Sequence, residues 1–443
     1  MVRFTYEEAV SYVYRIPSFT KKNTSEVTRR FYEYLGCPGE RAGSCRPAVV
    51  HVAGTNGKGS VCSYISSVMI GAGYRTAMFT SPHLVDIRER FRINGEMMRK
   101  EQFAYLVNFC LEKVEEFRKQ AEEPEYEKYH PTYFEFLFFL GMLWFDQQNV
   151  DLIVLETGMG GEKDATNVIK RPAVSVITRI GLDHMEYLGD TKEKIAQQKA
   201  GIIKRNCPVV FLDQEKNVDS VFVEKAKIMN AKAVSVSESD VASYKFKNKT
   251  VDFSLVSEYY DYVKVCLHTN AVYQRENAAL AVRALEILSQ RFRLSREQIE
   301  CGLTAARWEG RMDEVLPGVF IDGAHNEDGV NAFLESAGAD GCTGKRMLLF
   351  SVVSDKRFEK MTERIIESGL FGKIVVAPLE SSRSLSEEQL ASLWHGKAIL
   401  YSSPEEAVRN LISEKRPEDN VYAAGSLYLA GQLLALVRTE YVM

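Results

Sequence analysis

A glycine-rich loop directly behind a short apolar run most constrains what this chain can fold into. The apolar run Pro47-Ala48-Val49-Val50 continues into His51-Val52-Ala53-Gly54-Thr55-Asn56-Gly57-Lys58-Gly59-Ser60. Glycines let the backbone turn tightly, so that amide groups converge at the positive start of a following helix. A strand, such a loop and a helix predict a phosphate-binding loop in an α/β fold.

The side chains of this loop favour a nucleotide over an unliganded turn. Lys58 supplies a cation and Ser60 a hydroxyl suited to Mg²⁺. The common pattern G-x-x-x-x-G-K-[ST] does not fit, because Gly54 is too near Gly57 in the sequence and because Gly59 follows Lys58 where the pattern has a hydroxyl residue. This departure disfavours a generic kinase or GTPase. The residues expected to contact the nucleotide are Gly54, Thr55, Asn56, Gly57, Lys58, Gly59 and Ser60.

Length and charge narrow the class of protein further. A chain of 443 residues exceeds what one hydrophobic core usually supports, which favours two domains, with three as the alternative. The net charge of -4 gives no broad basic surface, so we expect small-molecule partners and no nucleic acid. The sequence lacks an apolar run of transmembrane length and an apolar secretion signal at its start, so we expect a cytoplasmic protein without membrane contact. The eight dispersed cysteines form no C-x-x-C pair and predict reduced thiols.

The order of apolar runs predicts two α/β domains. Short apolar runs alternate with helical segments from Val49 to Leu212, as in a parallel sheet wrapped by helices. The pattern changes to alternating polar and apolar residues near 235–268, which predicts a small antiparallel segment inside a first, nucleotide-binding domain of residues 1–306. The α/β rhythm then restarts, which predicts a smaller doubly wound domain of residues 307–443 without a phosphate loop of its own.

Three polar residues follow predicted strands near the phosphate loop. Ser81, Glu156 and His184 each lie just past an apolar run, where open α/β sheets gather ligand groups. Two oxygens and an imidazole suit Mg²⁺ or Mn²⁺ beside a triphosphate. Each has an ordinary alternative: a turn before Pro82, a surface charge at Glu156, and a cap after Asp183. Their shared position favours a metal site.

Further candidates lie later in the chain. Lys199 is expected on a helix; a surface lysine is the alternative, but the apolar turn after it indicates partial burial. Asn277 on an expected long helix and Arg311 in a segment interpreted as a hinge are candidates for nucleotide contacts. Asp322 and His325 stand at the carboxyl end of the second domain's first strand.

Taken in order, these motifs resemble the folylpolyglutamate synthase and dihydrofolate synthase family, a branch of the Mur-type ATP-dependent amide ligases. The resemblance covers almost the whole chain. Beside the phosphate loop, its carriers are Thr80-Ser81-Pro82-His83-Leu84, Pro131-Thr132-Tyr133-Phe134-Glu135, Asp164-Ala165-Thr166-Asn167, Ile180-Gly181-Leu182-Asp183-His184, Lys199-Ala200-Gly201-Ile202, Asn277-Ala278-Ala279, Gly310-Arg311, Asp322-Gly323-Ala324-His325-Asn326 and Gly425-Ser426-Leu427-Tyr428-Leu429.

The resemblance implies a fold and a set of ligand contacts. It implies a P-loop, Mur-ligase-like first domain with a parallel sheet and a Rossmann-like second domain. The implied cofactors are ATP and Mg²⁺, with two ions expected. The implied metal ligands are Ser60, Ser81, Glu156, His184 and Lys199, and the implied ATP contacts outside the loop are Asn277, Arg311 and Asp322.

The resemblance also implies catalytic roles for Lys58, Lys199 and His325. Lys199 matches a lysine that carries a carbamate in this family, and a carbamate is an anion whose oxygens a hard cation accepts. His325 would orient the phosphate or the incoming glutamate. One departure stands out, because the family usually has arginine where this chain has Glu162-Lys163. Either Lys163 supplies the missing cation or the local contact is lost, and no role is assigned to Glu162.

The expected activity is an ATP-dependent amide ligase that adds L-glutamate to the carboxylate of a folate through an acyl phosphate. Dihydropteroate is a possible second substrate, and a monomer is expected. The nearest alternative is another Mur-type ligase acting on a cell-wall nucleotide precursor; the segment Pro131–Glu135 and the Gly59-Ser60 ending of the loop favour the folate type. A non-catalytic nucleotide-binding protein would be expected to lack Lys58, Glu156 or His184, all of which are present.

Overall fold

The computed structural model describes residues 4–17, 23–40, 46–120, 124–247, 249–257, 259–354, 357–381 and 383–441. By their internal contacts the residues form two compact units. The first comprises residues 1–180, 186–238 and 278–306, and the second comprises 181–185, 239–277 and 307–443. This grouping differs from the predicted domains, 1–306 and 307–443, in that it places the segment 239–277 with the C-terminal part. The predicted domain bounds remain a prediction.

The described residues of the first unit build an eight-stranded sheet in the order β4-β3-β2-β5-β1-β6-β7-β8. Its strands are β1 (Ala48–Ala53), β2 (Thr76–Phe79), β3 (Phe91–Ile93), β4 (Glu96–Met97), β5 (Leu152–Glu156), β6 (Val174–Ile177), β7 (Val209–Leu212) and β8 (Ala233–Val236). The pairs β2–β5, β5–β1, β1–β6, β6–β7 and β7–β8 are parallel, while β3 and β4 add an antiparallel edge beside β2. Every residue of β1 and β5 is buried, as the continuous apolar runs predict for central parallel strands.

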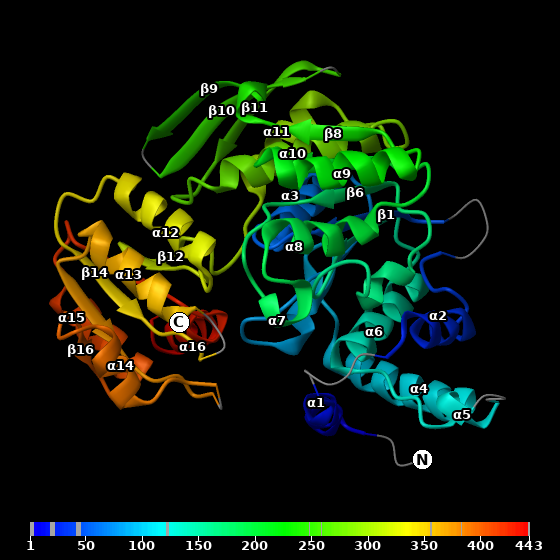
Figure 1. The fold of residues 1–443 in the computed structure, drawn as a ribbon, viewed down its shortest axis with the longest axis horizontal. Coiled ribbons are helices and arrows are strands. Elements are labelled where there is room, and N and C mark those ends of the chain that lie inside the picture. The colour runs from blue at the N-terminus through cyan, green and yellow to red at the C-terminus, as the bar shows by residue number, and fades with distance from the viewer. Residues whose placement is uncertain are drawn as a thin grey trace. The chain divides into compact units, whose positions relative to one another are not determined.

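The helices of this unit are α1 (Tyr6–Arg15), α2 (Ser25–Tyr34), α3 (Lys58–Gly71), α4 (Lys100–Lys119), α5 (Pro124–Glu127), α6 (Tyr133–Gln147), α8 (Lys192–Lys199), α9 (Lys216–Ile228) and α11 (Arg296–Ala305). Figure 1 shows α8 and α9 beside the sheet strands and α4 next to α6. Helix α11 packs closely on α3, because a Cβ atom at Gly302 would lie 2.5 Å from the Cα atom of Val68. An aromatic core joins α2, α4 and α6 around Phe31 and Phe139.

The second unit contains two sheets in its described residues. The strands β9 (Val241–Lys247), β10 (Thr250–Ser257) and β11 (Asp261–Leu267) form an antiparallel sheet. A six-stranded sheet follows the order β12-β13-β17-β14-β15-β16, with β12 (Asp313–Leu316), β13 (Val319–Ile321), β14 (Arg346–Phe350), β15 (Lys373–Val376), β16 (Ile399–Leu400) and β17 (Asn420–Ala424). Its helices are α12 (Glu327–Ala339), α13 (Phe358–Ser368), α14 (Glu387–Leu393), α15 (Pro404–Glu414) and α16 (Leu427–Glu440).

The remaining helices stand where the grouping changes along the chain. Helix α7 (Met185–Leu188) and helix α10 (Gln274–Leu288) each have residues in both units. None of the helices in the described ranges combines the length and the apolar character that crossing a membrane requires. The seven cysteines in those ranges are unpaired thiols, and Cys45 lies outside them.

The architecture confirms the predicted α/β fold class, with a parallel-rich sheet in the first unit and a smaller α/β sheet in the second. One boundary differs from the expectation. The antiparallel segment starts at Val241 and not near residue 235, because Ala233–Val236 pairs in parallel with β7 and closes the large sheet. Three of the four residues of β8 are not buried, so the apolar pattern that marks the other strands is weak there.

Candidate active site

The phosphate loop connects the end of β1 to the start of α3. A Cβ atom at Gly54 would lie 1.7 Å from the Thr178 hydroxyl oxygen, so only glycine fits there. Gly57 precedes α3 with a φ of 93°, and as a glycine it has no side chain that could cap the start of the helix. The Thr178 hydroxyl donates to the Asn56 carbonyl oxygen at 2.7 Å and fixes the loop. This geometry suits an anion at the helix start.

Lys58, Glu156 and Ser81 meet at this loop. The Nζ atom of Lys58 donates to the Thr55 carbonyl oxygen at 3.2 Å and lies 3.8 Å from Oε1 of Glu156. The Oε2 atom of Glu156 accepts the amide hydrogen of Ser81 at 2.9 Å. Because β1 pairs with β5 and places Val52 opposite Glu156, the carboxylate arrives beside the loop. The structure brings together these three predicted residues, and their roles as ligands stay predictions.

The oxygens gathered here fit a hard cation. The Glu156 side chain is only 3 % exposed, and Ser60 is buried in the first turn of α3. Within the described ranges no group of three or more His, Cys, Asp or Glu side chains is placed to hold a metal ion. Carboxylate, hydroxyl, water and phosphate oxygens are the ligands that Mg²⁺ prefers.

Lys199 is buried at the end of α8. The residue is only 4 % exposed, and its Nζ atom donates to the Gly54 carbonyl oxygen at 2.6 Å. A Cβ atom at Gly161 would lie 2.8 Å from the Lys199 carbonyl oxygen, so the segment after β5 packs on this helix end. The alternative of a surface lysine is therefore wrong, and Lys199 belongs to the phosphate loop's surroundings.

The Glu162-Lys163 departure lies in the same segment. The Glu162 amide donates to the Gln198 carbonyl oxygen at 2.7 Å, and a Cβ atom at Gly201 would lie 2.4 Å from the Glu162 Cα atom. The backbone at this position is therefore fixed by close packing. The side chains of Glu162 and Lys163 are both exposed.

In the second unit, His184 and His325 both approach Asp183. His184 has a φ of 49°, and its amide donates to Oδ1 of Asp183 at 2.9 Å. The Nε2 atom of His325 lies 3.5 Å from Oδ2 of Asp183, while its Nδ1 atom donates to the Gly323 carbonyl oxygen at 2.7 Å. The Asn326 amide group also donates to Asp183, at 3.1 Å. Asp183 is 9 % exposed, and no role of its own is assigned to it from the sequence.

Asp322 organises the segment that carries Arg311. Its carboxylate accepts hydrogen bonds from the Tyr273 hydroxyl at 2.8 Å and from the amides of Met312 at 2.9 Å and Ala324 at 2.8 Å. Burial raises the pKa of Asp322, and the positive charge of Arg311 opposes that rise. The Asp322 side chain therefore holds the backbone next to Arg311, whatever else it binds.

Asn277 lies in the first turn of α10. It is 6 % exposed, and its Nδ2 atom donates to the Gln274 side-chain oxygen at 3.0 Å. The predicted site residues thus fall into two sets, one in each unit. The first holds Gly54 to Ser60, Ser81, Glu156 and Lys199, and the second holds His184, Asn277, Arg311, Asp322 and His325.

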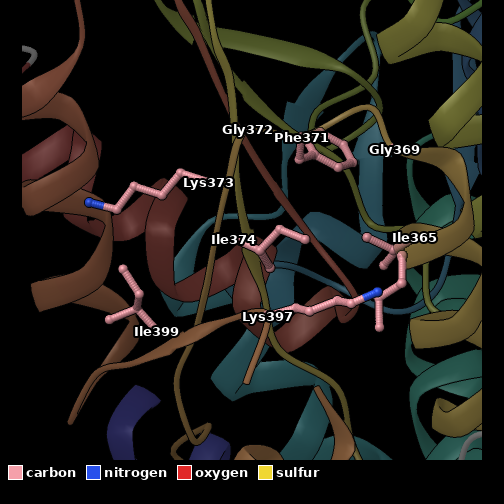
Figure 2. Close-up of a pocket in the computed structure, with 9 residues that line it drawn as sticks. Ile365, Gly369, Phe371, Gly372, Lys373, Ile374, Lys397 and Ile399 are labelled. Carbon is pink, nitrogen blue, oxygen red and sulfur yellow. The ribbon is translucent and has the colours of Figure 1, made fainter. Parts of the chain in front are cut away.

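A separate pocket of about 270 Å³ lies in the second unit at the start of β15 (Figure 2). Ile365, Phe371 and Ile374 contribute apolar side chains, and Lys373 in its wall pairs with Glu414 at 2.7 Å. Ligand groups of α/β sheets gather at the carboxyl ends of strands, whereas this pocket is at the amino end of β15. None of the predicted site residues lines it.

The chain matches two family models in sequence order. Residues 52–285 match the Mur ligase middle domain, and residues 307–427 match the Mur ligase glutamate ligase domain. The fold and the phosphate loop therefore define the protein as a Mur-type ligase.

Individual relatives narrow this class. The chain is 31 % identical to the dihydrofolate synthase/folylpolyglutamate synthase of Bacillus subtilis over 97 % of its own length and 98 % of that protein's. It superposes on an FPGS–AMPPCP–folate complex with a TM-score of 0.83 at 27 % identity, covering 99 % of this chain and 100 % of the other. It also superposes on Escherichia coli FolC in complex with DHPP and ADP, with a TM-score of 0.82 at 25 % identity and 98 % of each chain covered. The chain belongs to the folylpolyglutamate synthase/dihydrofolate synthase family.

Proposed function

We propose that this protein joins L-glutamate to the carboxylate of a folate at the expense of ATP. The contact of Lys58, Glu156 and Ser81 at the phosphate loop carries the assignment, because it combines a cation, a carboxylate and helix-start amides around one anion site. Family membership supports the acceptor class, since relatives of this chain are named folylpolyglutamate synthases and one was solved with AMPPCP and folate.

The reaction has two steps. A carboxylate oxygen of the folate attacks the γ-phosphorus of ATP, the bond to the bridging oxygen breaks, and ADP leaves with the electron pair. The glutamate amine then attacks the acyl phosphate, phosphate departs, and the amine loses a proton as the amide forms. Lys58 and the amides at the start of α3 stabilise the charge on the transferred phosphoryl group. Positioning the amine near the acyl phosphate favours its attack over that of water.

The proposed Mg²⁺ site lies beside Glu156. Glu156, Ser81 and Ser60 offer oxygen ligands at the phosphate loop, and Mg²⁺ bound there would neutralise charge on the phosphates. Lys199 is proposed as a carbamate, because an ammonium near a divalent cation is repelled whereas a carbamate is an anionic ligand. Its burial and its contact with Gly54 support this assignment. His184 is the further proposed metal ligand, and two ions are expected.

The second unit is proposed to supply the remaining contacts. Arg311 and Asn277 would bind ATP, and Asp322 would hold the Arg311 segment through its bonds to Met312 and Ala324. His325 would orient phosphate or glutamate, with its ring fixed by the Gly323 carbonyl group. We further propose that the enzyme acts as a monomer in the cytoplasm.

Dihydropteroate is the proposed second acceptor. The Bacillus subtilis relative carries both enzyme names, and the Escherichia coli relative was solved with DHPP and ADP. Both acceptors present a carboxylate to the same chemistry, so a single site would serve them.

The decisive experiment is a phosphate-release assay with three acceptors and a control without acceptor. The purified full chain is incubated with ATP, Mg²⁺ and L-glutamate, together with tetrahydrofolate, dihydropteroate, a cell-wall nucleotide precursor or no acceptor. Glutamate-dependent release with tetrahydrofolate, and glutamylated product by mass spectrometry, are expected. Release only with the cell-wall precursor would assign the chain to the other Mur-type activity, and ATP binding without release would make it a binding protein.

A further inference from the structure

A buried chain of hydrogen bonds runs from β1 to the segment behind Glu156. The Nε2 atom of His51 lies 2.8 Å from the Thr166 hydroxyl oxygen, and that oxygen lies 2.6 Å from Oδ1 of Asp164. His51 and Thr166 are fully buried, and Asp164 is 6 % exposed. None of the three has a part in the proposed reaction, yet His51 stands on the strand that carries the phosphate loop.

The direction of each hydrogen bond follows from the donors around Asp164. Its Oδ1 atom also accepts the Thr166 amide at 3.1 Å, and its Oδ2 atom accepts the Met159 amide at 2.9 Å, which is the pattern of an ionised carboxylate. The single hydroxyl proton of Thr166 is therefore donated to Asp164. The Thr166 oxygen must then accept from His51, so the ring proton of His51 stands on Nε2.

The surroundings of His51 agree with this proton order. The Nδ1 atom of His51 is buried and has no hydrogen-bond partner in the part of the chain that the structure describes. With the proton on Nε2 this atom is only an acceptor, and no N–H group is left unsatisfied. Burial and the positive charge of Lys204 lower the pKa of His51 to about 3, so the ring is neutral.

Asp164 ties down the segment that directly follows Glu156. Its carboxylate holds the Met159 amide, and its own amide donates to the Gly161 carbonyl oxygen at 3.1 Å. The segment has little room to shift, because a Cβ atom at Gly158 would lie 2.6 Å from the Phe134 ring. A change in the Asp164 carboxylate would thus reach the backbone next to Glu156.

We propose that His51 is a positioning residue for the metal-binding carboxylate. As the neutral Nε2–H tautomer it donates to Thr166, commits the Thr166 hydroxyl to Asp164 and so fixes the segment 157–161 behind Glu156. This positioning role goes beyond the proposed function. Only the expected effect on the Mg²⁺ dependence of the reaction rests on the proposed function. The tautomer itself is a property of the folded chain.

The tautomer is measured directly by ¹⁵N nuclear magnetic resonance. The chain has seven histidines, so a histidine-labelled sample gives few signals, and the His51→Gln variant assigns the one that disappears. A neutral ring with its proton on Nε2, unchanged from about pH 5 to about pH 8, is expected. A proton on Nδ1, or a ring that titrates in this interval, would overturn the proposal.

The consequence for the metal is measured by Mg²⁺ titration of glutamate-dependent phosphate release. His51→Leu removes the donor and Thr166→Val removes the hydroxyl, and each is expected to raise the half-saturating Mg²⁺ concentration by about 10-fold, as for other residues that support metal ligands. His51→Gln keeps an N–H donor at the place of Nε2 and should recover most of that loss. Tyr32→Phe is the control, since it removes another buried hydrogen bond of the same unit, to the Pro38 carbonyl oxygen.

The outcomes separate this inference from the proposed function. An inactive wild-type chain would count against the ligase assignment, while the resonance experiment would still decide the tautomer. An active wild type whose Mg²⁺ curve is the same in His51→Leu and Thr166→Val would overturn the positioning role. If His51→Leu does not fold, the nearly isosteric Thr166→Val decides the kinetic question.

Discussion

The Nζ atom of Lys199 lies 2.6 Å from the carbonyl oxygen of Gly54, the first glycine of the phosphate loop. These two residues are 145 positions apart, and the contact places a buried amine where a nucleotide's phosphates and their cation are proposed to bind. An ammonium next to Mg²⁺ is disfavoured by charge repulsion. Reaction of the neutral amine with CO₂ would replace this repulsion by an anionic ligand, and we therefore expect Lys199 to carry a carbamate.

Lys199→Ala should lower turnover by about 100-fold or more, because it removes a proposed metal ligand. Partial recovery is expected when a small carboxylic acid fills the gap. Lys204→Ala is the control, since Lys204 is half-buried and its Nζ atom likewise donates to a backbone carbonyl, that of Asn167, at 3.1 Å. Full activity of Lys199→Ala, or no ¹³C carbamate signal in the nucleotide-bound enzyme under labelled CO₂, would contradict the carbamate.

Lys58→Ala should reduce kcat by about 100- to 1000-fold with the fold intact. The loop is held by Gly54, Gly57 and Thr178, whereas the phosphates need the cation. Steady-state kinetics and thermal unfolding test this together. Lys170→Ala, which breaks only an exposed pair with Glu33, should leave both unchanged. Near-normal activity in a folded Lys58→Ala protein would remove the ATP-site assignment.

Glu156→Gln should raise the Mg²⁺ concentration needed for activity by about 10-fold or more, because it replaces a charged ligand by a neutral one. The glutamine can still accept the Ser81 amide, so folding should not suffer. His184→Ala is expected to act in the same direction. Glu33→Gln is the exposed control, and unchanged titration curves in both site variants would make Glu156 and His184 structural residues.

Arg311→Ala should raise the KM for ATP by about 10-fold, the cost of one charge-assisted contact to phosphate. Asp322→Ala should have a similar effect, because it releases the backbone of Met312 and Ala324. Arg364→Ala, in an exposed pair with Glu367 on the same unit, serves as the control. Variants that bind and use ATP like the parent would exclude both residues from the nucleotide site.

Acid should destabilise the fold in part through His51. The unfolded ring takes up its proton near pH 6.5 and the folded ring only near pH 3, so protonation favours the unfolded state between these values. From pH 7.5 to pH 5.5 this group should lower the wild-type free energy of unfolding by about 1 kcal/mol, a loss that His51→Gln does not share. Urea unfolding at both pH values measures the difference; an equal pH slope in both proteins would show that His51 is not buried neutral.

Most strands of the fold could be predicted from the sequence because they are continuous apolar runs. The apolar runs between Val49 and Leu212 match the central strands β1 and β6, in which every residue is buried. The antiparallel strands at the sheet margins were missed: β3 and β4 are short, and β12 is only partly buried, so no run of buried side chains marks them. An edge strand is defined by its partner, which the local sequence does not specify.

The candidate site could be predicted as far as its residues lie next to recognisable loops. The glycines around Lys58 and the carboxylate that ends β5 are local features of the sequence. The role of Asp183 was not visible, because its partner Asn326 is 143 residues away and only the folded chain joins them. The same holds for His51 and Thr166, whose contact depends on the pairing of distant segments.

The central position of β1 has a consequence for synthesis on the ribosome. The strand leaves the exit tunnel early, but its neighbours β5 and β6 are made much later. The Thr178 hydroxyl that fixes the loop at Asn56 is 122 residues downstream. The contact that fixes the loop therefore forms only after residue 178 has been synthesised, and the apolar strand β1 is made well before the two strands that cover its edges.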